Sequence, residues 1–422
     1  MLKRTHRFGA VALSAAMLFA AACSETVEDD GASATTEKRD DGATTEPQTA
    51  TTRGVTDTSV KVGGLQYDLF FGDGRIGAEA RIREFNDAGG VHGRTIEFLG
   101  AENNNNEPAK DIDIVRALVE QDEVFALLPV NAGAFGATDY VVENNIPMFG
   151  YGVNPAFCNN EVAFGITGCV TNPNLTTGSN ALGTVLADYF DGDTDKTVAF
   201  IGEDNDASRG GLELLSASVE DKGFTVVYAE PTLPAPPEQV GDVSPYITAM
   251  LSSDDGGAPD VIYLQATLAA VQLSEALKQA NYDGVIISPS YSPLLLGQPG
   301  YENILINTQV GVDPTEPNVQ RILAAAEAVK PGQQISLALI AGYLAADMFI
   351  AALDATGPDL TVEKFLATLN DGFTYELEGV VGKSTWPENH SRSVPCAVLT
   401  EAKNNAFVAV QKLMCGSNIE VG

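Results

Sequence analysis

Residues 59–66 read SVKVGGLQ, residues 74–90 read GRIGAEARIREFNDAGG, and residues 95–99 read TIEFL. The first and last runs are short, apolar and partly β-branched, which is typical of buried strands. In the middle run, apolar residues recur at helical spacing. The two glycines that end this run suit the left-handed turn that closes a helix. The order strand, helix, strand therefore predicts a βαβ unit with parallel strands.

The same alternation continues along the chain and predicts an α/β fold of two doubly wound lobes. One hydrophobic core does not extend over so long a chain, which is why we expect two lobes. We expect strands at Ser59–Leu65, Thr95–Leu99, Val124–Leu128, Ile146–Phe149, Thr197–Ile201, Thr225–Ala229, Val261–Leu264, Val285–Ile287 and Ala406–Leu413. We expect helices at Ile76–Asn86, Ala109–Glu120, Leu182–Phe190, Gly210–Lys222, Ser244–Leu251, Ala269–Ala280, Val319–Ala328 and Leu337–Leu353.

The polar stretch TNPNLTT at residues 171–177 marks the expected boundary between the lobes. Beyond Ser288 we expect the chain to return to the first lobe. We therefore divide the chain into a signal peptide (1–22), a lipidated cysteine with a disordered tether (23–54), the first part of lobe 1 (55–174), the first part of lobe 2 (175–288), the return to lobe 1 (289–375), and a C-terminal segment with hinge and lobe 2 parts (376–422).

The N-terminus has the layout of an export signal. Basic residues precede an apolar run at Phe8–Phe19, small residues follow at Ala20–Ala22, and Cys23 comes next. This order resembles a bacterial lipoprotein signal, in which the cysteine is lipidated and becomes the new N-terminus; Ala20 stands where such signals usually carry Leu. The alternative is an ordinary secretory signal that is cut near Cys23. Both alternatives place the mature chain outside the cytoplasm, and the first anchors it to the membrane by lipid alone.

Residues 24–53 are rich in Thr, Ala, Asp and Glu and hold little apolar surface, so we expect a disordered tether. The chain has five cysteines, and four remain once Cys23 is set aside. Proximity in the sequence favours the disulfides Cys158–Cys169 and Cys396–Cys415, and export makes such bonds chemically reasonable. The alternative is four buried free thiols.

Composition excludes several classes of function. A formal net charge of −33 argues against nucleic acid and against electrostatic docking on anionic lipid. Only three histidines occur, so a histidine metal site or a histidine-based triad is hard to build, and we expect no metal and no cofactor. The G-x-G-x-x-G pattern at Gly72–Gly77 stands apart from the preceding strand, so we interpret it as the approach to a helix and not as a dinucleotide site.

Several blocks resemble the branched-chain-amino-acid type of ABC-transporter substrate-binding proteins, and they occur in the order of that family. The first runs from GRIGAEARIREF to DEVFALL at residues 74–128, after SVKVGGLQ. The others are VAFIGEDNDASRGGLELL (198–215), DVIYLQATLAAVQLSEALKQANYDG (260–284) and IAGYLAADMFIAALDATG (340–357). The resemblance covers about residues 57–390, and its specificity rests on the order of the blocks.

The resemblance implies a type I periplasmic-binding fold, with a hinge between two α/β lobes and a ligand in the cleft between them. It implies a receptor, not an enzyme, that captures a small molecule and delivers it to an ABC permease. The alternatives are a sensing receptor of the same fold without transport and, further off, an extracytoplasmic enzyme. We expect a monomer.

In this fold the ligand-contacting loops follow the strands. Amino-acid-binding relatives place small hydroxyl residues in the third and fourth loops, where this chain reads NAGA and GYGVNP. This chain therefore lacks the Ser or Thr pair that grips an α-carboxylate in those relatives. The residues present supply aromatic walls with amide and carboxylate groups, which suit an aromatic or amide-bearing metabolite. The expected ligand classes are an amino acid, an amide or an aromatic metabolite. The expected ligand-binding residues are Gln66, Tyr67, Phe70, Phe71, Asn131, Ala132, Tyr151, Gly152, Asp206, Gln265 and Tyr291.

Overall fold

The structure is a computed structural model that describes residues 52–171, 176–234, 238–266 and 269–421. The expected signal peptide, Cys23 and the expected tether as far as residue 51 lie outside the described residues. Asp206 begins a described helix, but its side chain is outside the description.

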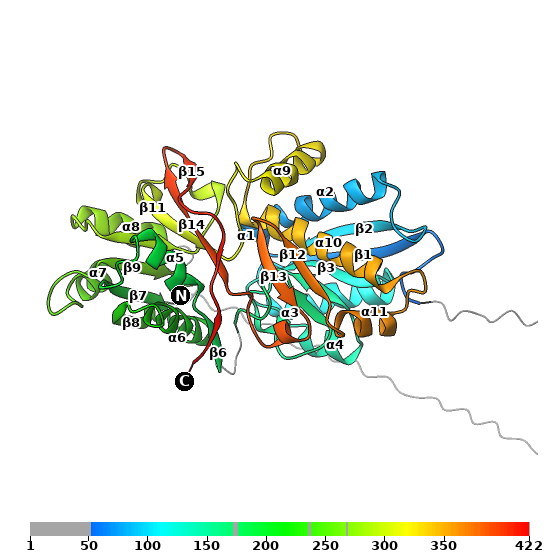
Figure 1. Cartoon of the computed structure of the whole chain (residues 1–422), viewed down its shortest axis with the longest axis horizontal. Helices are drawn as coiled ribbons and strands as arrows, with labels where there is room; N and C mark the ends of the chain where they lie inside the picture. Colours follow the sequence, from blue (N-terminus) through cyan, green and yellow to red (C-terminus); the bar gives the residue numbers. More distant parts are fainter. Residues whose placement is uncertain (1–51, 172–175, 235–237, 267–268, 422) are drawn as a thin grey trace, which may run out of the picture. The chain divides into compact units, whose positions relative to one another are not determined.

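The first sheet has five parallel strands in the order β2-β1-β3-β4-β5. Figure 1 labels β1, β2 and β3 of this sheet. Because every strand runs the same way, the loops after β1, β3 and β4 all leave from one edge of the sheet. The strands are β1 (Ser59–Gln66), β2 (Thr95–Asn103), β3 (Ala126–Asn131), β4 (Met148–Gly150) and β5 (Ala163–Gly165).

Helices from two distant parts of the chain pack on the first sheet. α10 lies against α2, and Gly77 and Gly342 let the two helices approach so closely that a Cβ at either glycine would strike backbone of the other helix. α10 is long and apolar enough to cross a membrane, but most of it is buried in the fold, so we assign it to the core. The helices are α1 (Asp68–Phe71), α2 (Gly74–Asp87), α3 (Pro108–Arg116), α4 (Thr138–Glu143), α9 (Pro317–Val329), α10 (Leu337–Thr356) and α11 (Val362–Leu369).

The second sheet has the order β15-β14-β11-β10-β9-β7-β8, with β16 paired to β14. Its strands from β7 to β11 are parallel, and β14 joins them antiparallel. The strands are β7 (Thr197–Glu203), β8 (Thr225–Leu233), β9 (Val261–Gln265), β10 (Val285–Ser288), β11 (Ile304–Thr308), β14 (Cys396–Lys403), β15 (Ala406–Ala409) and β16 (Met414–Cys415). The helices of this part are α5 (Ala181–Tyr189), α6 (Asp206–Glu220), α7 (Ser244–Leu251) and α8 (Ala269–Gln279).

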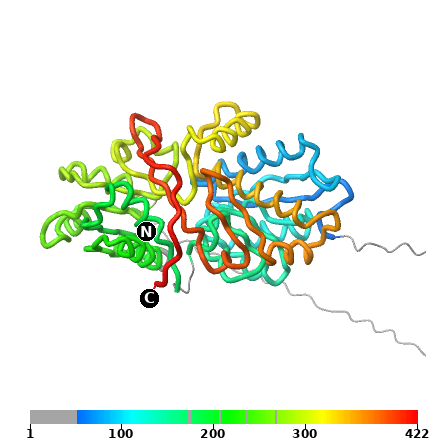
Figure 2. Tube along the Cα trace, in the orientation of Figure 1, coloured from blue at the N-terminus to red at the C-terminus, as the bar shows by residue number. Residues whose placement is uncertain are grey.

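Three segments connect the part of the chain around the first sheet with the part around the second: residues 166–180, 309–316 and 386–395. We call them the crossing segments; their described residues, which leave out 172–175, can be followed in Figure 2. The first contains β6 (Thr177–Ser179), which pairs with β17 (Asn418–Glu420) near the C-terminus. The third follows the hairpin of β12 (Thr374–Leu377) and β13 (Val381–Thr385).

The chain leaves the second sheet later than the expected boundary at residue 289. β11 pairs in parallel with β10, because its apolar residues Ile304–Ile306 complete the buried middle of that sheet. The expected strand at Ala406–Leu413 is shorter in the structure, and the long strand of this region is β14, which stands before it. The other expected helices and strands are confirmed, with shifts at their ends.

The folded chain begins before the expected end of the tether at residue 54. The Nε of Arg53 donates a hydrogen bond to the carbonyl of Val124 at 2.7 Å, and the amide of Lys61 donates to the carbonyl of Gly54 at 2.8 Å. Gly54 has a φ of +69° and packs against the backbone around Val124. Thr52–Gly54 is therefore part of the fold, held by backbone acceptors that the sequence does not reveal.

Both expected disulfides are confirmed. Cys158 and Cys169 are bonded and close a short loop after β4. Cys396 and Cys415 are bonded and fasten β14 to β16. A Cβ at Gly382 would strike the Sγ of Cys396, so this glycine is what lets β13 approach the second bond.

Candidate functional site

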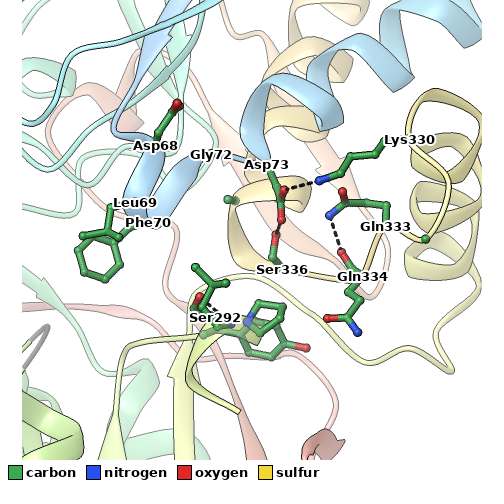
Figure 3. A pocket seen from close by; sticks show the side chains of 15 residues that line it. Asp68, Leu69, Phe70, Gly72, Asp73, Ser292, Lys330, Gln333, Gln334 and Ser336 are labelled. Atoms are coloured by element: carbon green, nitrogen blue, oxygen red, sulfur yellow. Dashed lines mark hydrogen bonds and ion pairs between the residues drawn. The ribbon is translucent and has the colours of Figure 1, made fainter. Parts of the chain in front are cut away.

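Loops from both sheets line an open cavity of about 270 Å³ (Figure 3). The first sheet contributes residues of the segment 68–73, which follows β1, and the second contributes Tyr291–Leu294, which follow β10. Residues of the segment 330–338, which leads into α10, form the remaining wall. We call this space the cleft cavity. Its walls come from three segments far apart in the sequence, so the cavity exists only in the folded chain.

The polar wall of the cleft cavity is built around Asp73. The hydroxyl of Ser336 donates a hydrogen bond to Oδ2 of Asp73 at 3.1 Å, and Nζ of Lys330 lies 3.8 Å from its Oδ1 (Figure 3). Ser336 also caps α10, because its hydroxyl accepts a hydrogen bond from the amide of Leu339 at 3.1 Å. The side chain that orients Asp73 is thus fixed at the start of the longest core helix.

Gln333 adds an acceptor to this wall. The residue is 8% exposed, and its Nε2 donates to the carbonyl of Gln334 at 3.0 Å. Its Oε1 is buried and has no hydrogen-bond partner among the described residues. A buried acceptor without a partner costs about 1–3 kcal/mol, so a ligand that donates to it gains more than it would on an open surface.

The apolar wall combines both sheets. Phe70 lies edge-on to Tyr67, with 5.5 Å between the ring centroids. On the side of the second sheet, the ring of Tyr291 stacks on that of Phe407 of β15, with 3.9 Å between the ring centroids, and Tyr291 is buried. At the mouth, Leu69 is 48% exposed and Leu294 is 72% exposed. The cavity therefore offers apolar surface for the body of a ligand beside a polar wall for its hydrogen-bonding groups.

Among the expected ligand-binding residues, Phe70 and Tyr291 come together at the cleft cavity. Gln66 does not line the cavity. Its Nε2 donates to the carbonyl of Gly72 at 3.0 Å, and its Oε1 accepts from the amide of Arg75 at 2.9 Å. Gln66 is fully buried and holds the loop between α1 and α2 in place. The polar residue at the end of β1 is thus a support of the site, and the loop that it holds forms the wall.

The residues expected after β3 and β4 form a second, buried layer. Oδ1 of Asn131 accepts a hydrogen bond from the amide of Tyr151 at 3.0 Å, and the carbonyl of Ala132 accepts from Nδ2 of Asn154 at 2.8 Å. The rings of Phe71 and Tyr151 are 6.2 Å apart. These contacts join the loops that follow the strands of the first sheet.

Gly152 lies in the same layer and has a φ of +92°. A Cβ at this position would strike the carbonyl of Gly168, so the close approach of two loops requires glycine here. Gly152 therefore joins the loop after β4 to the first crossing segment.

Gln265 lines a different cavity of about 190 Å³, which we call the hinge cavity. This space lies between α5, α6, the second sheet and the three crossing segments, and it shares no lining residue with the cleft cavity. Val261, Tyr263 and Gln265 alternate along β9, so Gln265 points to the face of the sheet that α5 and α6 cover.

Sequence reasoning did not identify Asp73, Lys330, Gln333 and Ser336 as residues of the site. One signal was present for the last three: the stretch KPGQQIS at residues 330–336 is a polar turn that ends in a cap residue before a long apolar helix. The sequence does not show that this turn lies beside α1. Among the described residues, no group of three His, Cys, Asp or Glu side chains is placed to hold a metal ion.

A family model described as "Periplasmic binding protein" matches residues 60–406. A solute-binding protein of an ABC transporter from R. palustris, solved with 4-hydroxybenzoate, is 17% identical with a TM-score of 0.64, and the match covers 85% of this chain and 97% of that one. A fatty acid ABC transporter substrate-binding protein from Thermomonospora curvata is 17% identical with a TM-score of 0.67, covering 87% and 95%. A leucine-binding protein from Thermotoga maritima is 15% identical with a TM-score of 0.62, covering 86% and 98%. No curated protein sequence matches significantly. At these identities the solved structures establish the fold.

Proposed function

The chain belongs to the periplasmic binding protein family, and we propose that it is the extracytoplasmic solute receptor of an ABC transporter. Solved structures of the same fold are solute-binding proteins of such transporters, and their ligands range from an aromatic acid to leucine and fatty acids. The proposal therefore fixes the role of the protein and leaves its ligand to be argued from its own cavity.

One observation carries the proposal: the cleft cavity has walls from both sheets. Phe70 stands after β1 of the first sheet and Tyr291 after β10 of the second, and both line the same space. A small molecule held there contacts both halves of the protein at once. Such a ligand stabilises the arrangement in which the two halves lie together, as ligand-driven closure requires.

The walls favour a ligand with an apolar body and at least one hydrogen-bond donor. Phe70, Tyr291 and Leu294 supply the apolar surface. On the polar wall, the carboxylate of Asp73 and the unpartnered Oε1 of Gln333 are both acceptors. We therefore propose an amino acid, an amide or an aromatic amine as the ligand class. In this proposal the protein binds the ligand without changing it chemically and delivers it to a permease.

Localisation follows from the family and from the N-terminal sequence. We propose that Cys23 carries lipid and that the following polar residues tether the receptor to the outer face of the membrane. A lipid anchor would keep the receptor at the surface where its permease lies. We propose a monomer, since residues of one chain line the cleft cavity. Mass spectrometry of the mature protein tests the anchor: unmodified Cys23, or an N-terminus beyond it, would refute it.

The experiment that tests the function is a thermal-unfolding screen of the purified protein against amino acids, amides, aromatic amines and aromatic acids. A ligand at a hundredfold its Kd stabilises the folded state by about 2.7 kcal/mol. We expect the largest shift from a compound with a donor group on an apolar body. If no compound of these classes shifts unfolding, the proposed ligand class is wrong.

Variants then locate the binding site. Asp73→Asn removes one negative charge from the polar wall and Phe70→Ala removes apolar surface, so each should weaken binding of the ligand found in the screen about tenfold or more. Glu79→Gln is the matched control, because Glu79 is an exposed carboxylate on α2 away from the cavity. Unchanged affinity in both cleft variants would place the ligand elsewhere.

A further inference from the structure

The hinge cavity is lined by described residues of all three crossing segments. Thr171 and Ser179 belong to the first, Gln309 to the second and Val394 to the third. One wall is the face of the second sheet that α5 and α6 cover. The cavity has a volume of about 190 Å³. The proposed receptor function makes no use of this space.

Among the described residues, those that line the hinge cavity are all uncharged. Leu182, Leu214 and Leu215 give it an apolar side, and Tyr263 and Asn307 give it a polar one. An ion would lose its hydration there without gaining a charged partner, which is costly. The lining therefore selects neutral molecules, in contrast to the cleft cavity with Asp73 and Lys330.

Gln265 supplies the specific feature. Its Oε1 is buried and has no hydrogen-bond partner among the described residues. Its amide group packs against Gly211 of α6 so closely that a Cβ on Gly211 would strike it. The amide is thus confined at the cavity wall with an open acceptor, and a hydrogen-bond donor in the cavity would satisfy it.

The volume sets the size of the occupant. An apolar protein cavity of about 150 Å³ binds benzene, so a space of this size holds one six-membered ring with a small substituent. We propose that the hinge cavity is a second small-molecule site, which binds an uncharged, ring-sized molecule through a hydrogen bond to Gln265. Its position among the crossing segments, beside Gln309, places the bound molecule where the two halves of the protein are joined.

The test uses the mature protein with phenol and benzene as neutral ring probes, one with a donor and one without. Calorimetric titration measures affinity, and protein NMR follows the side-chain amide signal of Gln265. These titrations are made with the cleft cavity saturated by the ligand found in the screen, because phenol also has a donor on an apolar body. We then expect phenol to bind one site more tightly than benzene and to shift that signal. Gln265→Leu should remove most of this preference, reducing phenol affinity about fivefold while leaving benzene affinity within twofold.

Two filling variants test the location. Leu215→Trp and Ala181→Leu add bulk from α6 and α5, and each should abolish phenol binding while leaving the protein folded by circular dichroism. Glu213→Trp is the matched control, because Glu213 is an exposed residue of the same helix and does not line the cavity. It should bind phenol as the unaltered protein does.

The outcomes separate this site from the cleft cavity. Phe70→Ala should leave phenol binding unchanged, and Leu215→Trp should leave the cleft ligand unchanged. If phenol binding is lost in Phe70→Ala but kept in Leu215→Trp, the ring site is the cleft and the inference is overturned. The inference is also overturned if neither probe binds, or if the Gln265→Leu variant has the same affinities for phenol and benzene as the unaltered protein. In either case the cavity holds only water.

Discussion

The phenolic hydroxyl of Tyr151 donates a hydrogen bond to Oε1 of Gln309 at 2.6 Å. Tyr151 follows β4 of the first sheet, and Gln309 follows β11 of the second. Burial raises the pKa of Tyr151, so the hydroxyl keeps its proton and remains a donor over the ordinary range of pH. The bond ties the loops of one sheet to a crossing segment, and Gln309 also lines the hinge cavity.

Removing this hydroxyl should weaken the fold. Tyr151→Phe leaves the acceptor of Gln309 without its donor, and we expect the free energy of unfolding to fall by about 1–2 kcal/mol in urea titrations. In a double-mutant cycle with Gln309→Leu, the coupling should be about 1 kcal/mol. Tyr228→Phe is the control, a partly buried tyrosine on β8. A coupling near zero would mean that the bond contributes nothing.

The stack of Tyr291 on Phe407 should matter for ligand affinity although Phe407 does not line the cleft cavity. Phe407→Ala frees one face of the tyrosine ring, and aromatic pairs contribute about 0.5–1.5 kcal/mol. We expect the Kd of the cleft ligand to rise about threefold to tenfold. Val408→Ala, at an exposed neighbour on β15, should leave the Kd unchanged. Equal effects of the two substitutions would contradict the role of the stack.

Gly77 tests the contact of α2 with α10. A Cβ there would strike the carbonyl of Leu339, and overpacking of this kind costs about 1–3 kcal/mol. Gly77→Ala should therefore lower the midpoint of urea unfolding, although alanine favours a helix more than glycine does. Gly241→Ala is the matched control, because a Cβ on Gly241 meets no atom of the described chain within 4 Å. A stabilised Gly77→Ala protein would show that the helices separate easily.

His390 should make stability depend on pH. It is buried between Phe164 and Trp386, and burial lowers its pKa from 6.5 to about 4. Between these values the unfolded chain binds the proton and the folded protein does not, so stability is complete above about pH 6.5 and falls toward pH 4. The loss should reach about 2–3 kcal/mol.

Carboxylates also titrate in this window, so the measurement is a comparison of urea unfolding at several pH values. His390→Gln should be less sensitive to pH than the unaltered protein by the amount given above. His92→Gln, at the other described histidine, is the matched control. If the curves of the two variants coincide, His390 does not carry the effect.

Periodicity and turn residues in the sequence predict the strands and helices well, because those patterns arise from local burial. β7 illustrates this: VAFI at residues 198–201 is buried throughout and lies inside the sheet. β11 was missed, because Ile304–Thr308 follows a run of turns and has no helix directly after it to mark a βαβ unit. Its place is decided by its pairing with β10 and β14.

The site was predictable only in part. Phe70 and Tyr291 follow strands and do line the cleft cavity. Gln66 and Gln265 also end strands, but their side chains do not line the cleft cavity. The side chain of Gln66 hydrogen-bonds to the loop that it supports, and that of Gln265 packs against α6. Lys330 and Gln333 reach the cavity because α10 packs on α2, a contact between residues about 260 positions apart.

The attachment of Thr52–Gly54 beside β1 has a mechanical consequence. A pull on the chain from its amino side reaches β1, which lies between β2 and β3. The hydrogen bonds of β1 to both neighbouring strands would have to break together, after the contacts of Arg53 had broken first. At the opposite end, β17 pairs with β6 and would peel away bond by bond within the described chain. The fold should therefore resist a pulling force better at its amino end, where a tether would hold it, than at its carboxyl end.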